Sequence, residues 1–273
     1  MTLFIYLLNG LGGAIYFTAT TILVLFPLIK YTKKEKIIER LFLVGFLIQT
    51  ISIGAMIFER GFFPAINLTE VLFLISWITF GILFIINALY KPRIARLFIL
   101  PIVFIMYLIS CENGIKIIPK DSLFTHPLFP VHVFFSIIGE ATFLIAFLLG
   151  IFFFIESYSL KRKKFIPIFG YLPSLEAIEE AMKRLLDVGF LCISVGLTTG
   201  IIWLKIDQDL WFDTKNPKLI LATISWCFYG CILLYHYLLN LRGKRIAYTA
   251  VFGFILIIGT FFGALFNHNW HSF

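Results

Sequence analysis

Residues 132–156 of the chain read HVFFSIIGEATFLIAFLLGIFFFIE. Between the histidine at its start and Glu156 at its end, Glu140 is the only charged residue. A helix that crosses a bilayer needs ~20 consecutive, predominantly apolar residues, and this stretch is longer than that. We therefore predict a transmembrane helix over 130–157.

The composition of the whole chain supports the same class. The 273 residues are 60% hydrophobic and 14% charged, and they include 33 phenylalanines. Soluble domains average about 25% charged residues. This composition excludes an ordinary soluble domain and indicates an integral membrane protein.

Seven further apolar stretches are long enough to cross a bilayer, so we predict an all-α, polytopic membrane helix bundle with about eight transmembrane helices. The predicted spans are 3–30, 37–58, 68–90, 94–111, 130–157, 184–205, 217–241 and 246–267. The fourth is the shortest and contains Pro101. The first lacks a basic n-region and is too long for a cleaved signal peptide, so it is expected to be retained.

Basic residues are concentrated in alternate loops. Five follow the first span, three the third, six the fifth and three the seventh, which places 17 of the 23 basic residues on one side. The positive-inside rule assigns that side to the cytoplasm and both termini to the outside. Topology thus explains the net charge of +8, and no basic stripe with exposed aromatic residues indicates a nucleic-acid partner.

On this topology the outer side collects imidazoles and aromatic rings. The histidines are His126, His132, His268 and His271, and the aromatic residues are Trp203, Trp211, Phe212 and Trp226. An aromatic belt with interfacial histidines is the simpler interpretation. Histidines at two separate helix ends are also suited to bind both axial positions of one haem iron. Zinc is less favoured, because the short ligand spacings typical of zinc sites are missing.

Three further polar residues fall within the predicted spans. Glu140 lies eight residues after His132, roughly 12 Å further along the helix, and is either functional or a protonated acid bonded to another helix. Asp187 follows Lys183 and Arg184 and suits an interfacial ion pair. His236 is either a hydrogen-bonded histidine inside the bundle or an inner-leaflet haem ligand.

The longest inner loop connects the fifth and sixth spans. Its second half, SLEAIEEAMKR at 174–184, has helical periodicity, with Ser174 as a candidate N-cap. We expect a short amphipathic helix there, separate from the span that begins at 184. It serves either as a connector or as a surface for the membrane or a partner.

No nucleophile–base pair, P-loop, dinucleotide-binding glycine motif or HExxH motif is found. An enzyme is therefore less favoured than a non-catalytic protein.

Several segments resemble the cytochrome c assembly family of haem-handling membrane proteins, of the CcsA and CcmC type. The resemblance covers most of 57–273 and is clearest from residue 130 onward. It is carried by HVFFSIIGEATFLIAFLLGIFFFIE, by LPSLEAIEEAMKRLLDVGFLCISVGLTTGIIW, by RGKRIAYTAVFGFILIIGTFFGALFNHNWHSF, and by RGFFPAINLTEVLFLISW, which is similar to the family segment P..N.YES..F..W.

The resemblance implies that His132 and His271 are the two external axial ligands of a haem, expected as haem b. It also implies that Trp203 and Trp226 bound an aromatic external segment, to which Trp211 and Phe212 belong. The expected function is to hold or present haem at the outer face for c-type cytochrome assembly. Apocytochrome c and a second membrane assembly subunit are the expected partners, and the bacterial inner membrane is the expected location.

Two departures point to an alternative. The family's tryptophan-rich WG.YW.WDPKE.W is replaced by LWFDTKNPKLILATISW, with Asn216-Pro217-Lys218 at the Asp-Pro-Lys position. The histidine expected in the seventh span falls at Leu234, and His236 lies about 200° further around the helix. The eroded loop and about eight spans resemble HemX-like members, so the alternative is a non-catalytic membrane regulator of haem biosynthesis.

We expect one transmembrane domain over 1–273, with four N-terminal helices in 1–111 and a haem-handling core in 130–273. A transporter centred on Glu140 and Asp187 is the least favoured function, because neither an internal repeat nor broken helix pairs are found.

Overall fold

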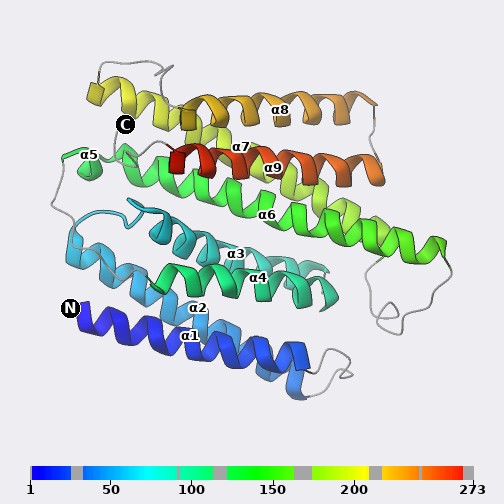
Figure 1. Cartoon of the computed structure of the whole chain (residues 1–273), viewed down its shortest axis with the longest axis horizontal. Helices are drawn as coiled ribbons and strands as arrows, with labels where there is room; N and C mark the ends of the chain where they lie inside the picture. The colour runs from blue at the N-terminus through cyan, green and yellow to red at the C-terminus, as the bar shows by residue number, and fades with distance from the viewer. Residues whose placement is uncertain are drawn as a thin grey trace. The chain divides into compact units, whose positions relative to one another are not determined.

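The structure, a computed structural model, describes residues 2–25, 33–90, 93–112, 122–162, 174–208, 217–239 and 242–266. The described ranges are mostly helical and contain no strand. The helices in chain order are α1 (Thr2–Leu25), α2 (Lys33–Arg60), α3 (Leu68–Tyr90), α4 (Arg93–Glu112), the single turn α5 (Ser122–Thr125), α6 (Leu128–Lys161), α7 (Leu175–Gln208), α8 (Pro217–Leu239) and α9 (Lys244–Phe266) (Figure 1).

The chain divides into two compact units. Unit 1 is Met1–Thr125 and contains α1 to α5; unit 2 is His126–Phe273 and contains α6 to α9. Within unit 1, α1 packs on α2 and α4, and α3 packs on α4. Within unit 2, α6 packs along α7 and α9, and α8 packs on α9 and α7.

A hydrogen-bonded glutamine lies at the centre of unit 1. Gln49 is 1% exposed and accepts a hydrogen bond from the Tyr16 hydroxyl at 3.1 Å. Its Nε2 donates to the Ser76 hydroxyl and to the Phe73 carbonyl, both at 3.0 Å. The Tyr16 ring stacks on Phe80 with centroids 4.3 Å apart. Because each polar atom of this amide has a partner, the core holds it without an unsatisfied group.

Glycines allow α6 and α7 to approach closely in unit 2. A Cβ at Gly139 of α6 would lie 2.3 Å from Ile193 of α7. A Cβ at Gly189 of α7 would lie 2.6 Å from the Thr142 hydroxyl, and one at Gly196 would lie 2.5 Å from the Ser136 hydroxyl. Small residues at helix contacts are typical of membrane bundles, where packing replaces the hydrophobic effect as the force between helices.

The remaining helices of unit 2 use the same device. Gly150 of α6 faces the backbone of α9, where a Cβ would lie 3.1 Å from the Ala247 carbonyl oxygen. Gly253 of α9 faces Tyr229 of α8, whose ring stacks on Phe143 of α6 with centroids 3.9 Å apart. The bundle around α6 is therefore held by close backbone approach and aromatic stacking.

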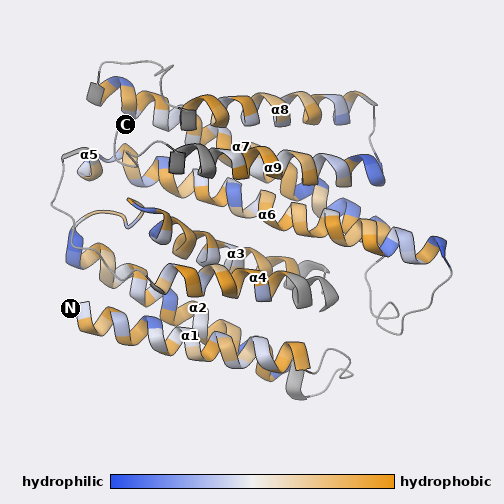
Figure 2. Cartoon of the chain, viewed as in Figure 1, coloured by the Kyte–Doolittle hydropathy of each residue, from blue (hydrophilic) through white to orange (hydrophobic). Residues whose placement is uncertain are grey.

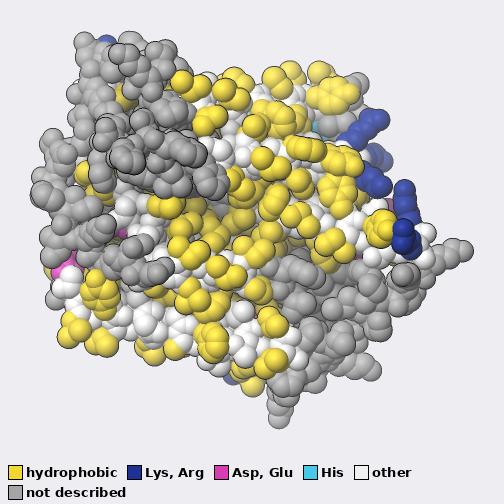
Figure 3. All heavy atoms as spheres, viewed as in Figure 1, with side chains coloured by type: hydrophobic (Ala, Val, Ile, Leu, Met, Phe, Trp, Pro, Cys, Tyr) yellow, Lys and Arg dark blue, Asp and Glu magenta, His cyan; other side chains and the backbone are white. Residues whose placement is uncertain are grey.

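Six of the described helices are long and apolar enough to cross a membrane: α1, α2, α3, α6, α7 and α8. The described part of α4 adds a shorter apolar helix, Ile99–Cys111. Figure 2 shows that hydrophobic residues predominate along these helices, and Figure 3 shows hydrophobic side chains over much of the described part of the visible face. Leu191 and Phe252, for example, are 64% and 58% exposed. These features fit the predicted membrane helix bundle, because lipid contacts such side chains favourably.

Three predictions about individual elements can be assessed. α4 is a continuous helix through Pro101, as expected for the fourth span. The prediction of a separate amphipathic helix before residue 184 was wrong, because α7 runs without a break from Leu175 to Gln208. The Ser174 hydroxyl accepts from the Ala177 N–H at 3.2 Å, so the predicted N-cap is confirmed. With neither Gly nor Pro from Leu175 to Val188, nothing breaks the helix before the span.

Candidate functional site

His132 lies in the second turn of α6 and faces α7 across the glycine-lined contact. Its Nδ1 lies 2.7 Å from the carbonyl oxygen of Gly196. A carbonyl oxygen only accepts hydrogen bonds, so Nδ1 is the donor and carries a proton. In a neutral imidazole with this proton, the lone pair is on Nε2, one of the two ring nitrogens through which a histidine binds a metal.

Gly200, one turn beyond Gly196, provides the space for this imidazole. A Cβ at residue 200 would lie 2.6 Å from His132 Nδ1 and 2.7 Å from Cε1. Real Cβ atoms essentially never make contacts this short. Gly196 and Gly200 form a GxxxG pair on one face of α7, and they position the histidine between two closely packed helices.

An aromatic wall lies next to the imidazole. Trp203 of α7 is 4% exposed, and its ring centroid lies 6.2 Å from that of His132. Phe129, one turn before His132 on α6, lies 5.4 Å from the same indole. The sequence predicted a role for Trp203 beside the outer histidine, and the fold places the two rings together.

A hydrogen bond and a ring contact hold Trp226 of α8 against α7. Its Nε1 donates to the Ser194 hydroxyl at 2.7 Å, and its ring stacks on Phe190 with centroids 5.8 Å apart. Ser194 lies two residues before Gly196 on α7. Trp226 therefore connects α8 to the helix that positions His132.

The other polar residues of the predicted spans have different surroundings. Glu140 is half-buried on α6. Lys183 pairs with Glu179 at 2.8 Å and Arg184 with Glu180 at 2.8 Å, each one turn earlier on α7. Asp187 lies close to the Tyr237 side chain of α8.

His236 lies in the last turn of α8 and is half-buried. Its Nδ1 is buried and has no hydrogen-bond partner among the residues that the structure describes. Leu234, the position at which the resemblance places a histidine, is 62% exposed. The local fold thus turns Leu234 outward and His236 toward the bundle.

Four of the predicted site residues are described: His132, Trp203, Trp226 and His236. The fold brings His132 and Trp203 together. His271, Trp211 and Phe212 lie outside the described residues, as does His268. Within the described ranges, no group of three or more His, Cys, Asp or Glu residues is placed to hold a metal ion.

Sequence reasoning missed Gly196 and Gly200. Their GxxxG spacing within an apolar helix was the available signal, but the sequence alone does not show which residue of another helix faces them.

Comparisons with known proteins identify relatives. A sequence model of the family described as "Cytochrome C assembly protein" matches residues 65–271. Protein HemX of Brevibacillus brevis is 25% identical over 245 residues, which cover 87% of this chain and 88% of that protein. Cytochrome c biogenesis protein CcsA of Guillardia theta is 25% identical over 272 residues, with the same coverage of both chains. Inner membrane protein YpjD of Escherichia coli (strain K12) is 28% identical over 170 residues, which cover 61% of this chain and 62% of that protein.

Proposed function

Because this chain belongs to the cytochrome C assembly protein family, we propose that it binds haem at the outer face of the bacterial inner membrane and presents it for c-type cytochrome assembly. His132 and His271 are the two axial ligands in this proposal. Relatives named as cytochrome c biogenesis proteins that align with most of the chain support the proposed role.

One observation carries the proposal: the hydrogen bond from His132 Nδ1 to the Gly196 carbonyl. Metal-binding histidines commonly donate their other ring N–H to a backbone carbonyl or carboxylate, which fixes the tautomer and the orientation of the ring. His132 has this partner on a rigid helix. This partner supports the proposal that His132 is a haem ligand.

The aromatic residues give the proposed site its apolar wall. Trp203 is buried beside His132, and Trp226 holds α8 against α7. In the proposal, Trp211 and Phe212 extend this platform. Haem iron with two imidazole ligands has no open axial position for oxygen, which suits a carrier. The cargo is expected as haem b, held without a covalent bond.

The proposed topology has eight transmembrane helices with both termini outside. It rests on the distribution of lysine and arginine among the loops, and it places the start of α6 and His132 at the outer surface. The second unit, with the sequence up to residue 273, is the haem-handling core. Apocytochrome c and a second membrane assembly subunit are the proposed partners.

His236 is proposed as an inner ligand that binds haem before His132 and His271 do. The buried Nδ1 without a partner among the described residues supports this role, because a buried polar atom normally has one. Substitution of His236 by Ala is expected to lower haem retention while the outer site remains.

A visible absorption spectrum of the detergent-purified chain, oxidised and then reduced, tests the proposal. A low-spin bis-imidazole spectrum is expected for the wild type and is expected to disappear in the double variant His132→Ala/His271→Ala. His126→Asn is the matched control, because it removes an outer imidazole. The asparagine oxygen preserves an acceptor for the Leu128 N–H, which His126 Nδ1 accepts at 3.2 Å. If the protein is purified without haem after expression with added haem precursor, the proposal of a haem carrier is wrong.

The second candidate is a membrane regulator of haem biosynthesis. The match to Protein HemX over most of both chains favours this function. The loss of most tryptophans from the family's tryptophan-rich segment agrees with it. In this case the basic inner segment 158–184 contacts a partner. Replacing Lys161, Arg162, Lys163 and Lys164 by glutamine is expected to abolish regulation, whereas His132→Ala/His271→Ala leaves it intact.

A further inference from the structure

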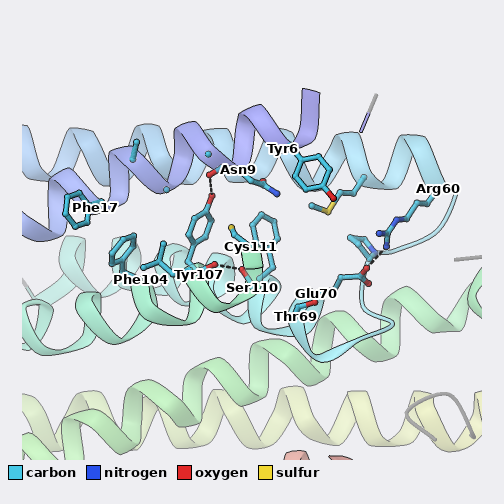
Figure 4. Close-up of a pocket in the computed structure, with 17 residues that line it drawn as sticks. Tyr6, Asn9, Phe17, Arg60, Thr69, Glu70, Phe104, Tyr107, Ser110 and Cys111 are labelled. Carbon is cyan, nitrogen blue, oxygen red and sulfur yellow. Dashed lines mark hydrogen bonds and ion pairs between the residues drawn. The ribbon is translucent and has the colours of Figure 1, made fainter. Parts of the chain in front are cut away.

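Unit 1 contains a cavity of about 490 Å³ that is separate from the site at His132. Helices α1, α2, α3 and α4 contribute to its lining, together with the connection that precedes α3 (Figure 4). Small-molecule sites typically enclose about 300–1,000 Å³, so the cavity has room for a single small ligand.

The polar part of the cavity contains a buried ion pair. Arg60, at the end of α2, contacts Glu70 in the first turn of α3 at 2.5 Å, with side chains 7% and 9% exposed. Glu70 also accepts from the Ile66 N–H at 2.9 Å and from Asn67 Nδ2 at 3.2 Å. The cap of α3 thus fixes the carboxylate, and the two charges neutralise each other within the cavity wall.

Asn9 of α1 supplies a hydrogen-bond donor to the lining of the cavity. Its Oδ1 accepts from the Ser52 hydroxyl at 2.6 Å, and its backbone carbonyl accepts from the Tyr107 hydroxyl at 2.8 Å. The Nδ2 of the same amide donates to no other residue in the described ranges. Asn9 therefore presents an unused donor to the cavity that it lines.

The rest of the cavity is largely apolar and open to the side. Phe17, Phe104 and Leu108 line it, and Phe17 and Leu108 are 59% and 47% exposed. Gly10 also lines it, and a Cβ at that position would meet no atom within 4 Å. In a membrane helix bundle, such an opening between exposed apolar side chains faces the acyl chains of the bilayer.

We propose that this cavity binds one molecule of an electroneutral bilayer amphiphile whose head carries a carbonyl acceptor. The carbonyl accepts from Asn9 Nδ2, and the apolar body lies against Phe17 and Phe104. An anionic ligand is disfavoured because Arg60 is already neutralised and Glu70 would repel it. Haem is disfavoured for the same reason, since it carries two carboxylates, and no histidine is among the described lining residues.

Two membrane sources share this chemistry: a prenylated quinone and a neutral glyceride. Native mass spectrometry of the full chain in detergent, with added decylubiquinone or mono-oleoylglycerol, distinguishes them. We expect retention of one molecule of one or both probes per chain. Retention of only one identifies the source. Oleate, an anionic amphiphile of similar length, is expected to bind at least about tenfold more weakly.

Cavity-filling variants locate the binding. Gly10→Leu fills the cavity from α1 and is expected to abolish retention of the neutral probe. Gly54→Leu is the matched control, since Gly54 also has no atom within 4 Å of a Cβ but does not line the cavity. Ala14→Leu is a second filling variant, and the thermal unfolding midpoint of each variant verifies its fold.

Three results would overturn the proposal: retention of neither neutral probe by the wild type, equal retention by Gly10→Leu and Gly54→Leu, or tighter binding of oleate. None of these results depends on haem bound at His132, so the two proposals fail independently.

Discussion

Gly200 of α7 and His132 of α6 share one small volume at the helix contact. A Cβ at residue 200 would lie 2.6 Å from the Nδ1 that is hydrogen-bonded to Gly196. The missing side chain of one residue therefore determines where the imidazole of the other can lie. This relationship makes the orientation of His132 a property of the α6–α7 packing.

Gly200→Ala is expected to displace the His132 ring and break its bond to the Gly196 carbonyl. Loss of such an outer partner typically costs 10–100-fold in metal affinity, so we expect about a tenfold loss of haem retention or more. The measurement is the haem-to-protein ratio and the reduced-minus-oxidised spectrum of purified protein.

Gly259→Ala on α9 is the control for this change, because a Cβ at residue 259 meets no atom within 4 Å. Identical haem content in the two alanine variants would contradict the positioning role of Gly200.

Ser194→Ala leaves the indole N–H of Trp226 without the acceptor that it contacts at 2.7 Å. Interhelical hydrogen bonds in membrane proteins contribute about 0.6 kcal/mol on average and about 1.7 at most. We expect a loss of about 1 kcal/mol in the free energy of unfolding, measured by titration with a denaturing detergent. In a Trp226→Phe background, which lacks the donor, the same substitution should cost clearly less.

Ser159→Ala is the comparison for this pair, since the Ser159 hydroxyl only donates to the Ile155 carbonyl within its own helix. If Ser194→Ala cost the same with and without the indole, the bond would have no role in joining α7 and α8.

Reporter fusions test the proposed topology. Green fluorescent protein fused after residue 162 is expected to fluoresce, because the basic loop after α6 is assigned to the cytoplasm. Green fluorescent protein fused after residue 125 is expected to be dark, whereas alkaline phosphatase fused at the same position is expected to be active. The reverse pattern at both positions would move His132 to the inner side and remove the outer haem site.

The sequence predicted the helices well because long apolar runs determine membrane helices locally. His132 became a candidate for the same reason: it lies at the start of an apolar run, where an imidazole is conspicuous, and its role as a ligand stays a prediction. The predicted break in the helix before residue 184 was wrong, because the charged residues there were interpreted as lying outside the membrane helix. The pairs Glu179–Lys183 and Glu180–Arg184 instead support a continuous α7.

The Gly200–His132 contact and the cavity in unit 1 depend on which helices pack together. A single sequence does not show which helices are neighbours. Gly200 and His132, which are in contact, lie 68 positions apart in the sequence. The cavity in unit 1 joins Asn9, Arg60 and Tyr107 from three helices. Periodicity identifies the face of each helix, but it does not identify the helix that covers it.

The buried pair of Arg60 and Glu70 gives a prediction about stability. Removing one partner of a buried ion pair typically costs about 3–5 kcal/mol, because the other charge is left unpaired. Glu70→Gln preserves an acceptor for the Ile66 N–H, so its effect reports on the charge. We expect a loss in that range for Glu70→Gln, and a smaller loss for the double variant Arg60→Gln/Glu70→Gln, in the same unfolding titration. Glu180→Gln, whose partner Arg184 is 63% exposed, should cost less than about 1 kcal/mol. A double variant less stable than Glu70→Gln would mean that the residual charge of Arg60 is not what destabilises the single variant.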